Sequence, residues 1–240
     1  MQPLIEVRDL HFSYDDGTVA LDGVDFQLFP AETVAVFGAN GSGKTTFVLH
    51  LNGLLMGKGS VRVCGMPVER ETLTSIRQKV GLVFQDSDNQ LFMPTVLEDV
   101  AFGPLNLGLA AGEARARALE ALEQVGAFDL GGRAPYHLSA GEKKRVAIAG
   151  ILAMRPEILV LDEPTTFLDP PGQASLLDLL DRLPQAKILV THDADCARAI
   201  AHRGVFFEAG RITGEGTVDE VIARFRWDKA TLKPPISDRY

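Results

Sequence analysis

Alternation of apolar and polar side chains is the first pattern along the chain. It runs over residues 4–14 and again over 19–29, on either side of the turn-rich Asp15-Asp16-Gly17. A period of two is typical of strands with one buried face, and a short polar turn between two such runs favours antiparallel pairing. The pattern therefore predicts an antiparallel β lobe at the N-terminus.

After this lobe, short apolar runs alternate with segments of helical periodicity. The apolar runs have the length and composition of buried strands, and they occupy residues 32–37, 61–64, 80–84, 158–161 and 187–190. The helical segments occupy residues 44–55, 113–125, 141–153 and 173–183. This alternation predicts an α/β fold with a mainly parallel core sheet.

The C-terminal part of the chain shows three further patterns. A β hairpin is expected over residues 204–212, with its turn at Ala209-Gly210, and a short amphipathic helix follows over 218–225. The last residues, 229–240, contain Pro234-Pro235 and are expected to be extended. No role is assigned to them from their sequence.

The composition is that of an ordinary globular protein, with 46% hydrophobic and 23% charged residues among 240. No internal repeat or low-complexity linker divides the chain. We therefore expect one domain over residues 1–227, including a helical lobe at about 86–155, and a tail over 228–240.

The balance of charges argues against nucleic acid as a partner. The 24 Lys and Arg against 32 Asp and Glu give a formal net charge of −8, and no dense basic run is present. An anionic ligand such as ATP would have to be neutralised locally, by backbone N–H groups, a helix terminus, a lysine and a metal ion.

Cysteine usage and hydropathy bear on the compartment. Only Cys64 and Cys196 are present, without CxxC or His/Cys spacing, so neither a disulfide framework nor a zinc site is indicated. The first residues lack a basic segment followed by an apolar run, and no apolar stretch approaches 18 residues. We therefore expect a cytoplasmic protein that is neither secreted nor membrane-spanning.

One glycine-rich segment carries the clearest chemistry. It matches the pattern GxxxxGK[ST] between an apolar strand and a helix, and it reads Gly38-Ala39-Asn40-Gly41-Ser42-Gly43-Lys44-Thr45. Its N–H groups are expected to face the β-phosphate of a nucleotide, Lys44 to reach the β- and γ-phosphates, and Thr45 to bind Mg²⁺. Thr46 completes the expected nucleotide-binding set. A chance glycine-rich turn does not account for a match at all four specified positions of this eight-residue pattern in this context.

An acidic pair follows a buried strand further along the chain. Residues 158–161 are all apolar, and Asp162-Glu163 stand at the carboxyl end of this run. Ligands of parallel sheets bind at that end, so Asp162 is expected to hold Mg²⁺ through water and Glu163 to polarise the attacking water. The alternative interpretation, an acidic surface loop after a strand, is disfavoured because a phosphate-binding loop lies upstream.

The segment Leu138-Ser139-Ala140-Gly141-Glu142 resembles the LSGGQ signature of ATP-binding cassette ATPases, and it precedes the acidic strand as in that family. The chain resembles this family over about residues 4–225. The resemblance implies a P-loop NTPase fold with a helical signature lobe, and ATP and Mg²⁺ as cofactors. It also implies a dimer, in which Ser139 and the N–H of Gly141 contact a γ-phosphate bound to the second ATPase subunit.

Four more elements of the chain resemble family elements in the family's order. Gln85 resembles the Q-loop glutamine that links the metal site to the helical lobe, and His192 the switch histidine that contacts the γ-phosphate and water. Leu168-Asp169 resembles the D-loop at the dimer interface, and Tyr14 the aromatic that stacks on adenine. Alone, Gln85 would be taken for a solvated loop residue and Tyr14 for a core residue.

Three longer segments resemble the energy-coupling-factor importers within that family, namely 84–92, 98–104 and 141–150. Residues 105–109 resemble the cobalt and nickel members. The resemblance implies integral membrane transport subunits as partners, a peripheral position on the cytoplasmic face of the cell membrane, and cobalt or nickel, or else a vitamin, as the solute. It leaves open whether the second ATPase is a copy or a sister protein.

The chain departs from the family pattern at three places. Ala140 replaces the second residue of the signature, which matters if that backbone needs positive φ. Glu142 replaces Gln, as is usual in the energy-coupling-factor branch. Thr166-Phe167 replaces a pair of small residues before the D-loop, and Phe167 is expected to perturb the packing of Asp169 across the dimer.

Alternatives remain open at this stage. The apolar-rich stretch 91–109 is either core of the helical lobe or the seat of a membrane partner's cytoplasmic helix. A soluble cassette ATPase of repair or translation would carry paired cassettes or coiled-coil inserts, and a non-hydrolysing regulatory module would lack Glu163 or His192. The five histidines form no metal-ligand spacing, so the solute is expected to bind elsewhere.

Overall fold

The computed structural model describes residues 2–228, and the prediction for 229–240 lies outside them. Its centre is a six-stranded sheet of order β10-β9-β3-β8-β7-β6. The strands are β3 (Thr33–Phe37), β6 (Val80–Val83), β7 (Ile158–Asp162), β8 (Ala186–Val190), β9 (Arg203–Glu208) and β10 (Arg211–Gly216). All neighbours pair in parallel except β9 with β10. The predicted parallel core and C-terminal hairpin are thus confirmed.

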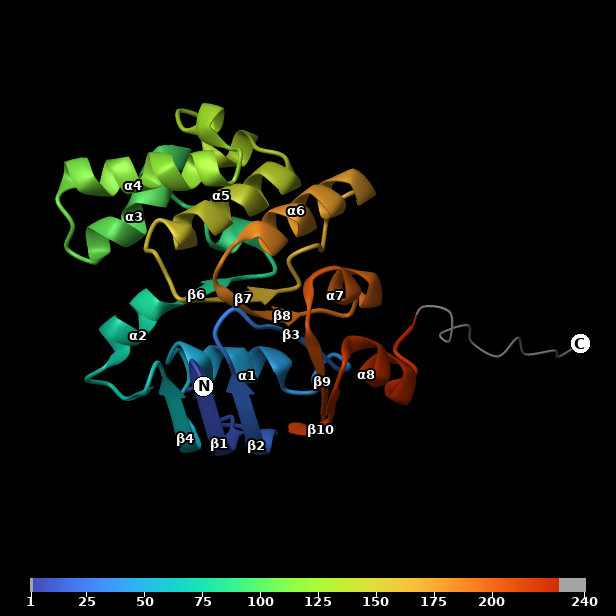
Figure 1. Cartoon of the computed structure of the whole chain (residues 1–240). Coiled ribbons are helices and arrows are strands. Elements are labelled where there is room, and N and C mark those ends of the chain that lie inside the picture. Colours follow the sequence, from blue (N-terminus) through green and yellow to red (C-terminus); the bar gives the residue numbers. More distant parts are fainter. Residues whose placement is uncertain (1, 229–240) are drawn as a thin grey trace, which may run out of the picture.

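A second, antiparallel sheet is formed by the N-terminal lobe. It consists of β1 (Ile5–Ser13), β2 (Val19–Leu28), β4 (Lys58–Val63) and β5 (Met66–Pro67), in the order β2-β1-β4-β5. Figure 1 shows helix α1 (Lys44–Leu51) between this sheet and the central one. Phe47 of α1 lies at 5.2 Å from Phe26 of β2 and at 5.1 Å from Phe207 of β9, measured between ring centroids. This shared core fixes α1 against both sheets.

Helices cover the other face of the central sheet (Figure 1). They are α3 (Val96–Asn106), α4 (Ala111–Gln124), α5 (Ala140–Leu152) and α6 (Pro170–Arg182). Their apolar side chains pack with Val83, Leu159 and Leu161 of the sheet in one buried cluster. Helices α7 (Ala194–Ile200) and α8 (Val218–Phe225) cover Phe37 and Phe206, and α2 (Leu73–Lys79) precedes β6.

Some elements differ from the sequence-based expectation. Helix α1 ends at Leu51 rather than at residue 55, because Gly53 adopts φ 68° just after it. Helix α3 was not predicted, since Pro104 interrupts its helical pattern. A capping box between Thr95 and Glu98 starts this helix. Within residues 2–228 no helix has the length and apolarity needed to cross a membrane.

Arg203 joins the two sheets at their edge. Its guanidinium donates to Glu32 at 2.8 Å, to the Gln27 carbonyl at 2.7 Å and to Glu215 at 2.6 Å. The Arg203 and Glu32 side chains are only 19% and 17% exposed. The pair therefore links β9 to the loop after β2 in a partly dry environment, where loss of one partner is costly.

We expect Arg203→Met to lower the free energy of unfolding by about 2 kcal/mol, because it keeps the aliphatic stem but leaves Glu32 unpaired. Arg155→Met is the matched control, since Arg155 pairs with Glu120 at 2.9 Å while both side chains are more than half exposed. That change should cost less than about 0.5 kcal/mol. Urea unfolding of both variants checks this, and equal effects would contradict it.

Candidate functional site

Parallel pairing brings the predicted site residues to one edge of the central sheet. The carboxyl ends of β3, β8, β7 and β6 are neighbours, and they lead into the glycine-rich loop, His192, Glu163 and Gln85 respectively. The N–H of Glu163 donates to the Val190 carbonyl at 2.9 Å, which continues the β7–β8 ladder into the loops. Ligands of open α/β sheets bind at this edge.

Two glycines allow the loop after β3 to turn tightly. Gly38 has φ 143°, and a Cβ there would lie 2.4 Å from the Phe207 carbonyl oxygen. Gly43 has φ 105°, and a Cβ there would lie 2.4 Å from the Ala20 carbonyl oxygen. Gly43 is also the N-cap of α1, which has no side-chain cap. The N–H groups at the N-terminus of α1 can therefore donate hydrogen bonds to a bound anion.

Lys44 places a buried cation inside this loop. Its side chain is 8% exposed, and Nζ donates to the carbonyls of Gly38 at 2.7 Å and Ala39 at 2.9 Å. Burial lowers the pKa of Lys44, while the nearby carboxylates of Glu163 and Asp162 act to raise it. An ammonium held in this position can donate hydrogen bonds to a phosphate ligand.

Thr45 and Asp162 form a pair of hard oxygen ligands beside Lys44. The Thr45 hydroxyl donates to Asp162 Oδ2 at 3.2 Å, and Asp162 is 8% exposed. Burial raises the pKa of Asp162, because the carboxylate has lost water without gaining a full counter-charge. A divalent cation would reverse this effect, and oxygen donors are those that Mg²⁺ prefers. The residues present therefore fit a magnesium ion.

Glu163 and His192 are joined by a hydrogen bond. His192 Nδ1 lies 2.8 Å from Glu163 Oε2, with the histidine 63% exposed and the carboxylate 12% exposed. Glu163 has φ 46°, which is uncommon for a residue with a side chain. Strained backbone of this kind is often found at functional sites, where it directs a side chain.

A cavity of about 350 Å³ gathers most of the predicted nucleotide-binding residues. Those of the predicted set that line it are Tyr14, Asn40, Gly41, Gly43, Lys44, Thr45, Thr46, Gln85, Asp162 and Glu163. Tyr14 is 43% exposed, and its hydroxyl lies 2.9 Å from that of Thr46, so it stands at the cavity and not in the core. Gly38, Ala39 and Ser42 complete the loop behind the lining.

The predicted signature and D-loop residues lie away from this cavity. Ser139, Ala140, Gly141, Glu142 and Asp169 line a separate cavity of about 570 Å³ between the N-termini of α5 and α6. Ser139 is the N-cap of α5 and donates its hydroxyl to Glu142 Oε2 at 2.8 Å. Asp169 is the N-cap of α6. One chain thus does not bring its own signature to its own nucleotide cavity.

The departures at the signature are accommodated locally. Ala140 is the first residue of α5 and has no positive φ, so its methyl group causes no backbone strain. Glu142 forms a capping box with Ser139, and the hydrogen bonds from Ser139 lower the pKa of Glu142. Phe167, in contrast, is 75% exposed and has φ 68°.

Four further residues at the site were not predicted from the sequence. Thr18, just before β2, and Val19 and Ala20, the first two residues of β2, line the nucleotide cavity beside Tyr14. Lys144 of α5 is buried against the Gln85 loop, although it belongs to a basic run that suggests a solvated surface. The signal in the sequence for the burial of Lys144 was its helical spacing from Ile148, which lies one turn later on the same buried face.

Fold and site together define the class of P-loop nucleotide-binding domains, and comparison with known proteins narrows this class. Residues 21–166 match the family model described as ABC transporter. An energy-coupling factor transporter ATP-binding protein of Methanothermobacter thermautotrophicus is 51% identical over 224 residues, covering 91% of this chain and 72% of that one. The chain therefore belongs to the ABC transporter family, as an ATP-binding ATPase.

Solved structures agree with this assignment. CbiO1 from Clostridium perfringens, described as part of an ABC transporter complex, superposes with a TM-score of 0.84 at 37% identity, covering 94% of this chain and 92% of that one. A dimeric bacterial ABC transporter cassette gives 0.80 at 29% identity, covering 89% and 98%. Another structure of that cassette is a post-hydrolysis state bound to ADP and phosphate.

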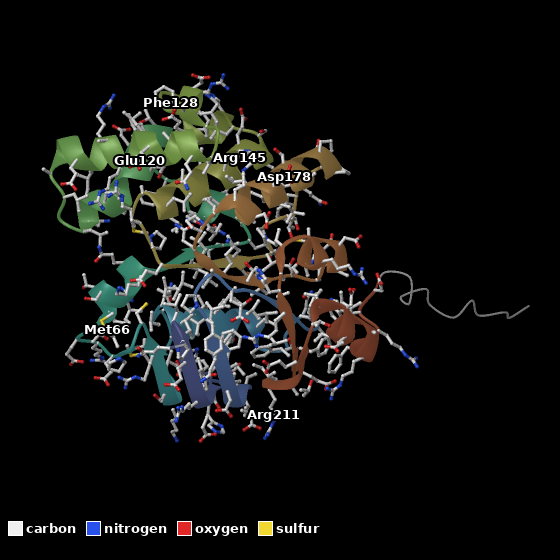
Figure 2. All side chains as sticks on the ribbon, in the orientation of Figure 1. Met66, Glu120, Phe128, Arg145, Asp178 and Arg211 are labelled. Carbon is white, nitrogen blue, oxygen red and sulfur yellow. The ribbon has the colours of Figure 1, made fainter. Side chains whose placement is uncertain are left out.

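We expect Phe167→Gly to raise the free energy of unfolding by about 1 kcal/mol, because glycine removes the cost of a left-handed backbone while little buried surface is lost. Phe128→Gly is the control, since Phe128 is 53% exposed, has no positive φ and lies at the outer end of the helical lobe (Figure 2). It should be destabilising. Thermal and urea unfolding of both variants measure these changes. If Phe167→Gly is destabilised, the backbone at Phe167 is not strained.

Proposed function

We propose that this chain is the ATP-hydrolysing subunit of an energy-coupling-factor importer, which energises uptake of a small solute through membrane partners. The observation that supports this proposal is that Lys44, Asp162, Glu163 and Gln85 line one cavity, whereas the signature residues 139–142 line another. A site divided in this way is completed by a second ATPase subunit.

The proposed reaction uses the groups in their observed positions. Tyr14 stacks on adenine, and the loop N–H groups with Lys44 hold the β- and γ-phosphates. Glu163, oriented through His192 Nδ1, accepts a proton from the attacking water, and positioning and charge neutralisation supply most of the catalysis.

Magnesium is the metal ion that we propose for this site. Thr45, Asp162 through water, and Gln85 are its proposed ligands, since all three offer oxygen donors at one cavity. When bound, the ion would neutralise charge on the phosphates.

The second ATPase subunit is proposed to complete each nucleotide site. Ser139 and the N–H of Gly141 of one subunit would contact the γ-phosphate of the ATP bound to the other subunit. Asp169 would lie across the interface between the two subunits. The dimeric cassette that resembles this chain supports such an arrangement. The Ser139 hydroxyl now donates to Glu142, so it must exchange that partner for phosphate when the dimer closes.

For the solute we propose cobalt or nickel, with a vitamin as the second candidate. Residues 105–109, which resemble the cobalt and nickel members, favour a metal ion. CbiO1, described as part of the ABC transporter complex cbiONQ, and the energy-coupling factor relatives support a transport complex and leave the solute open. Within residues 2–228 no group of three or more His, Cys, Asp or Glu could hold a metal ion. The solute would therefore bind to the membrane partners.

A groove on the helical lobe is the proposed seat of the membrane partner. It encloses about 470 Å³, and two of its lining residues, Phe92 and Phe102, meet edge to face with 5.0 Å between ring centroids. Val96 and Val100 of the same stretch are fully buried, so 91–109 contributes to both core and surface. Asp99 lines the groove, and its buried Oδ2 has no hydrogen-bond partner among the described residues. An apolar segment with one hydrogen-bond donor fits this groove.

The remaining proposals follow from this role. Residues 1–227 would form one nucleotide-binding domain with its helical lobe at about 86–155, attached peripherally to the cytoplasmic face of the membrane. Nucleic acid is not a proposed partner, given the net charge of −8. A non-hydrolysing module is disfavoured by the Glu163–His192 contact, and a soluble cassette ATPase by the energy-coupling factor relative.

Glu163→Gln should lower kcat for ATP by about 100-fold or more, because the amide cannot accept a proton from water, while the affinity for a fluorescent ATP analogue stays within about twofold. Glu157→Gln is the matched control at the opposite end of β7, where Glu157 pairs with Lys79. Steady-state ATPase assays compare the two. Wild-type turnover in Glu163→Gln would remove Glu163 from the mechanism.

The same variant tests the solute. Cells that express the chain with its membrane partners should accumulate radiolabelled cobalt or nickel, and Glu163→Gln should reduce uptake to background. Background uptake with both proteins would contradict a metal solute and favour a vitamin, without affecting the ATPase assignment.

Replacing both Phe92 and Phe102 with Ala should reduce ATP-driven uptake by about tenfold, since aromatic anchors carry much of the energy of such interfaces. Basal ATPase activity of the isolated subunit should persist. Phe128→Ala, an exposed aromatic outside the groove, should leave uptake unchanged. If uptake survives the double change, the groove does not transmit closure.

A further inference from the structure

Helix α5 directs a lysine into the interior of the molecule. Lys144 lies in the second turn of α5, five residues after Ser139, and is only 2% exposed. Its Nζ donates to the Phe84 carbonyl at 3.2 Å and to the Gln85 carbonyl at 2.7 Å. Among the residues that the structure describes, no carboxylate lies within ion-pair distance of this ammonium.

A buried ammonium without an ion pair is an expensive way to fill this position. Burial lowers the pKa of Lys144, and the charges of Asp86 and Asp162 only partly counteract this effect. An apolar side chain of similar length would avoid the desolvation cost. The two hydrogen bonds to the Gln85 segment are therefore the specific contribution of the lysine.

These bonds connect two parts of the proposed machinery. Gln85 lines both the nucleotide cavity and a second cavity of about 330 Å³, which Lys144 and Ala140 also line. The preceding residue of α5, Lys143, pairs with Asp88 at 2.5 Å. Because α5 is a continuous helix, a displacement of the Gln85 segment that moved Lys144 would also move Ser139 at the N-terminus of this helix.

We infer that Lys144 is a positioning residue that makes the Gln85 segment and the signature helix move as one unit. The arrangement at this chain's own nucleotide site then sets where Ser139 and Gly141 stand for the nucleotide of the second subunit. This inference rests on the proposed dimeric ATPase and adds a link between its two half-sites.

Lys144→Met tests it, because Met keeps the approximate length of the side chain and removes both hydrogen bonds that Nζ donates. The melting temperature should be unchanged or higher, and the affinity for a fluorescent ATP analogue should stay within about twofold. In the Glu163→Gln background, the ATP concentration needed for half dimerisation should rise about tenfold, and in the wild-type background kcat should fall about tenfold. Lys144→Gln retains an N–H₂ donor group on a shorter, neutral side chain and should recover part of both.

Lys187→Met is the matched control. Lys187 is 4% exposed and donates to the carbonyls of Leu183 at 2.6 Å and Gln185 at 2.9 Å, at the amino end of β8, away from the site. It should leave kcat and dimerisation unchanged. Dimerisation and ATPase are followed by light scattering and phosphate release.

Three results overturn the inference. They are wild-type dimerisation and turnover in Lys144→Met, an equal loss in Lys187→Met, and a loss of folding or of analogue binding in Lys144→Met, which assigns a purely structural role. If the Glu163→Gln parent itself fails to dimerise with ATP, the proposed dimeric ATPase falls together with this inference. A parent that dimerises keeps the two questions separate.

Discussion

Parallel hydrogen bonding between β3, β8, β7 and β6 is the constraint on which the candidate site depends. Asp162 pairs with Val190, and the N–H of Thr191 donates to Val36 at 3.2 Å, so the loops that follow start level with one another. Because side chains alternate along a strand, a slip of one residue would turn Asp162 to the opposite face. The two cores on either side of the sheet prevent such a slip.

This rigid sheet supports several locally unfavourable features. Lys44 and Asp162 are each 8% exposed, Lys144 is 2% exposed, and Glu163 adopts positive φ. Each of these costs free energy in the isolated chain, and the packed strands around them supply the stability that keeps them in place. Lys44, Asp162 and Glu163 lie together at the sheet edge where ligands bind, while at the opposite edge Lys187 is buried as well, with its ammonium bonded to two carbonyls.

The separation of the nucleotide cavity from the signature surface is the second organising feature. Ser139 and Asp169 cap two neighbouring helices, α5 and α6, whose N-termini face the same cavity. Arg145 of α5 donates to the Val125 carbonyl at the end of α4 at 2.7 Å and to the Ser175 hydroxyl of α6 at 2.7 Å, and so connects α5 to both helices. The signature helix is thus held from both sides, and Lys144 adds a connection to the Gln85 segment.

The sequence by itself determined the class of fold and the chemistry of the loop after β3, because period-two and period-3.6 patterns and local glycine positions are encoded by near neighbours. It also placed Glu163 at the end of a buried strand. Helix α3 was hidden by Pro104, and the left-handed backbone of Glu163 and Phe167 depends on the turn between β7 and α6. Only the tertiary structure decided which segment Lys144 is buried against and that Tyr14, whose residue type alone indicates a core position, stands at the cavity. Both depend on segments distant in the chain, which a single sequence does not bring together.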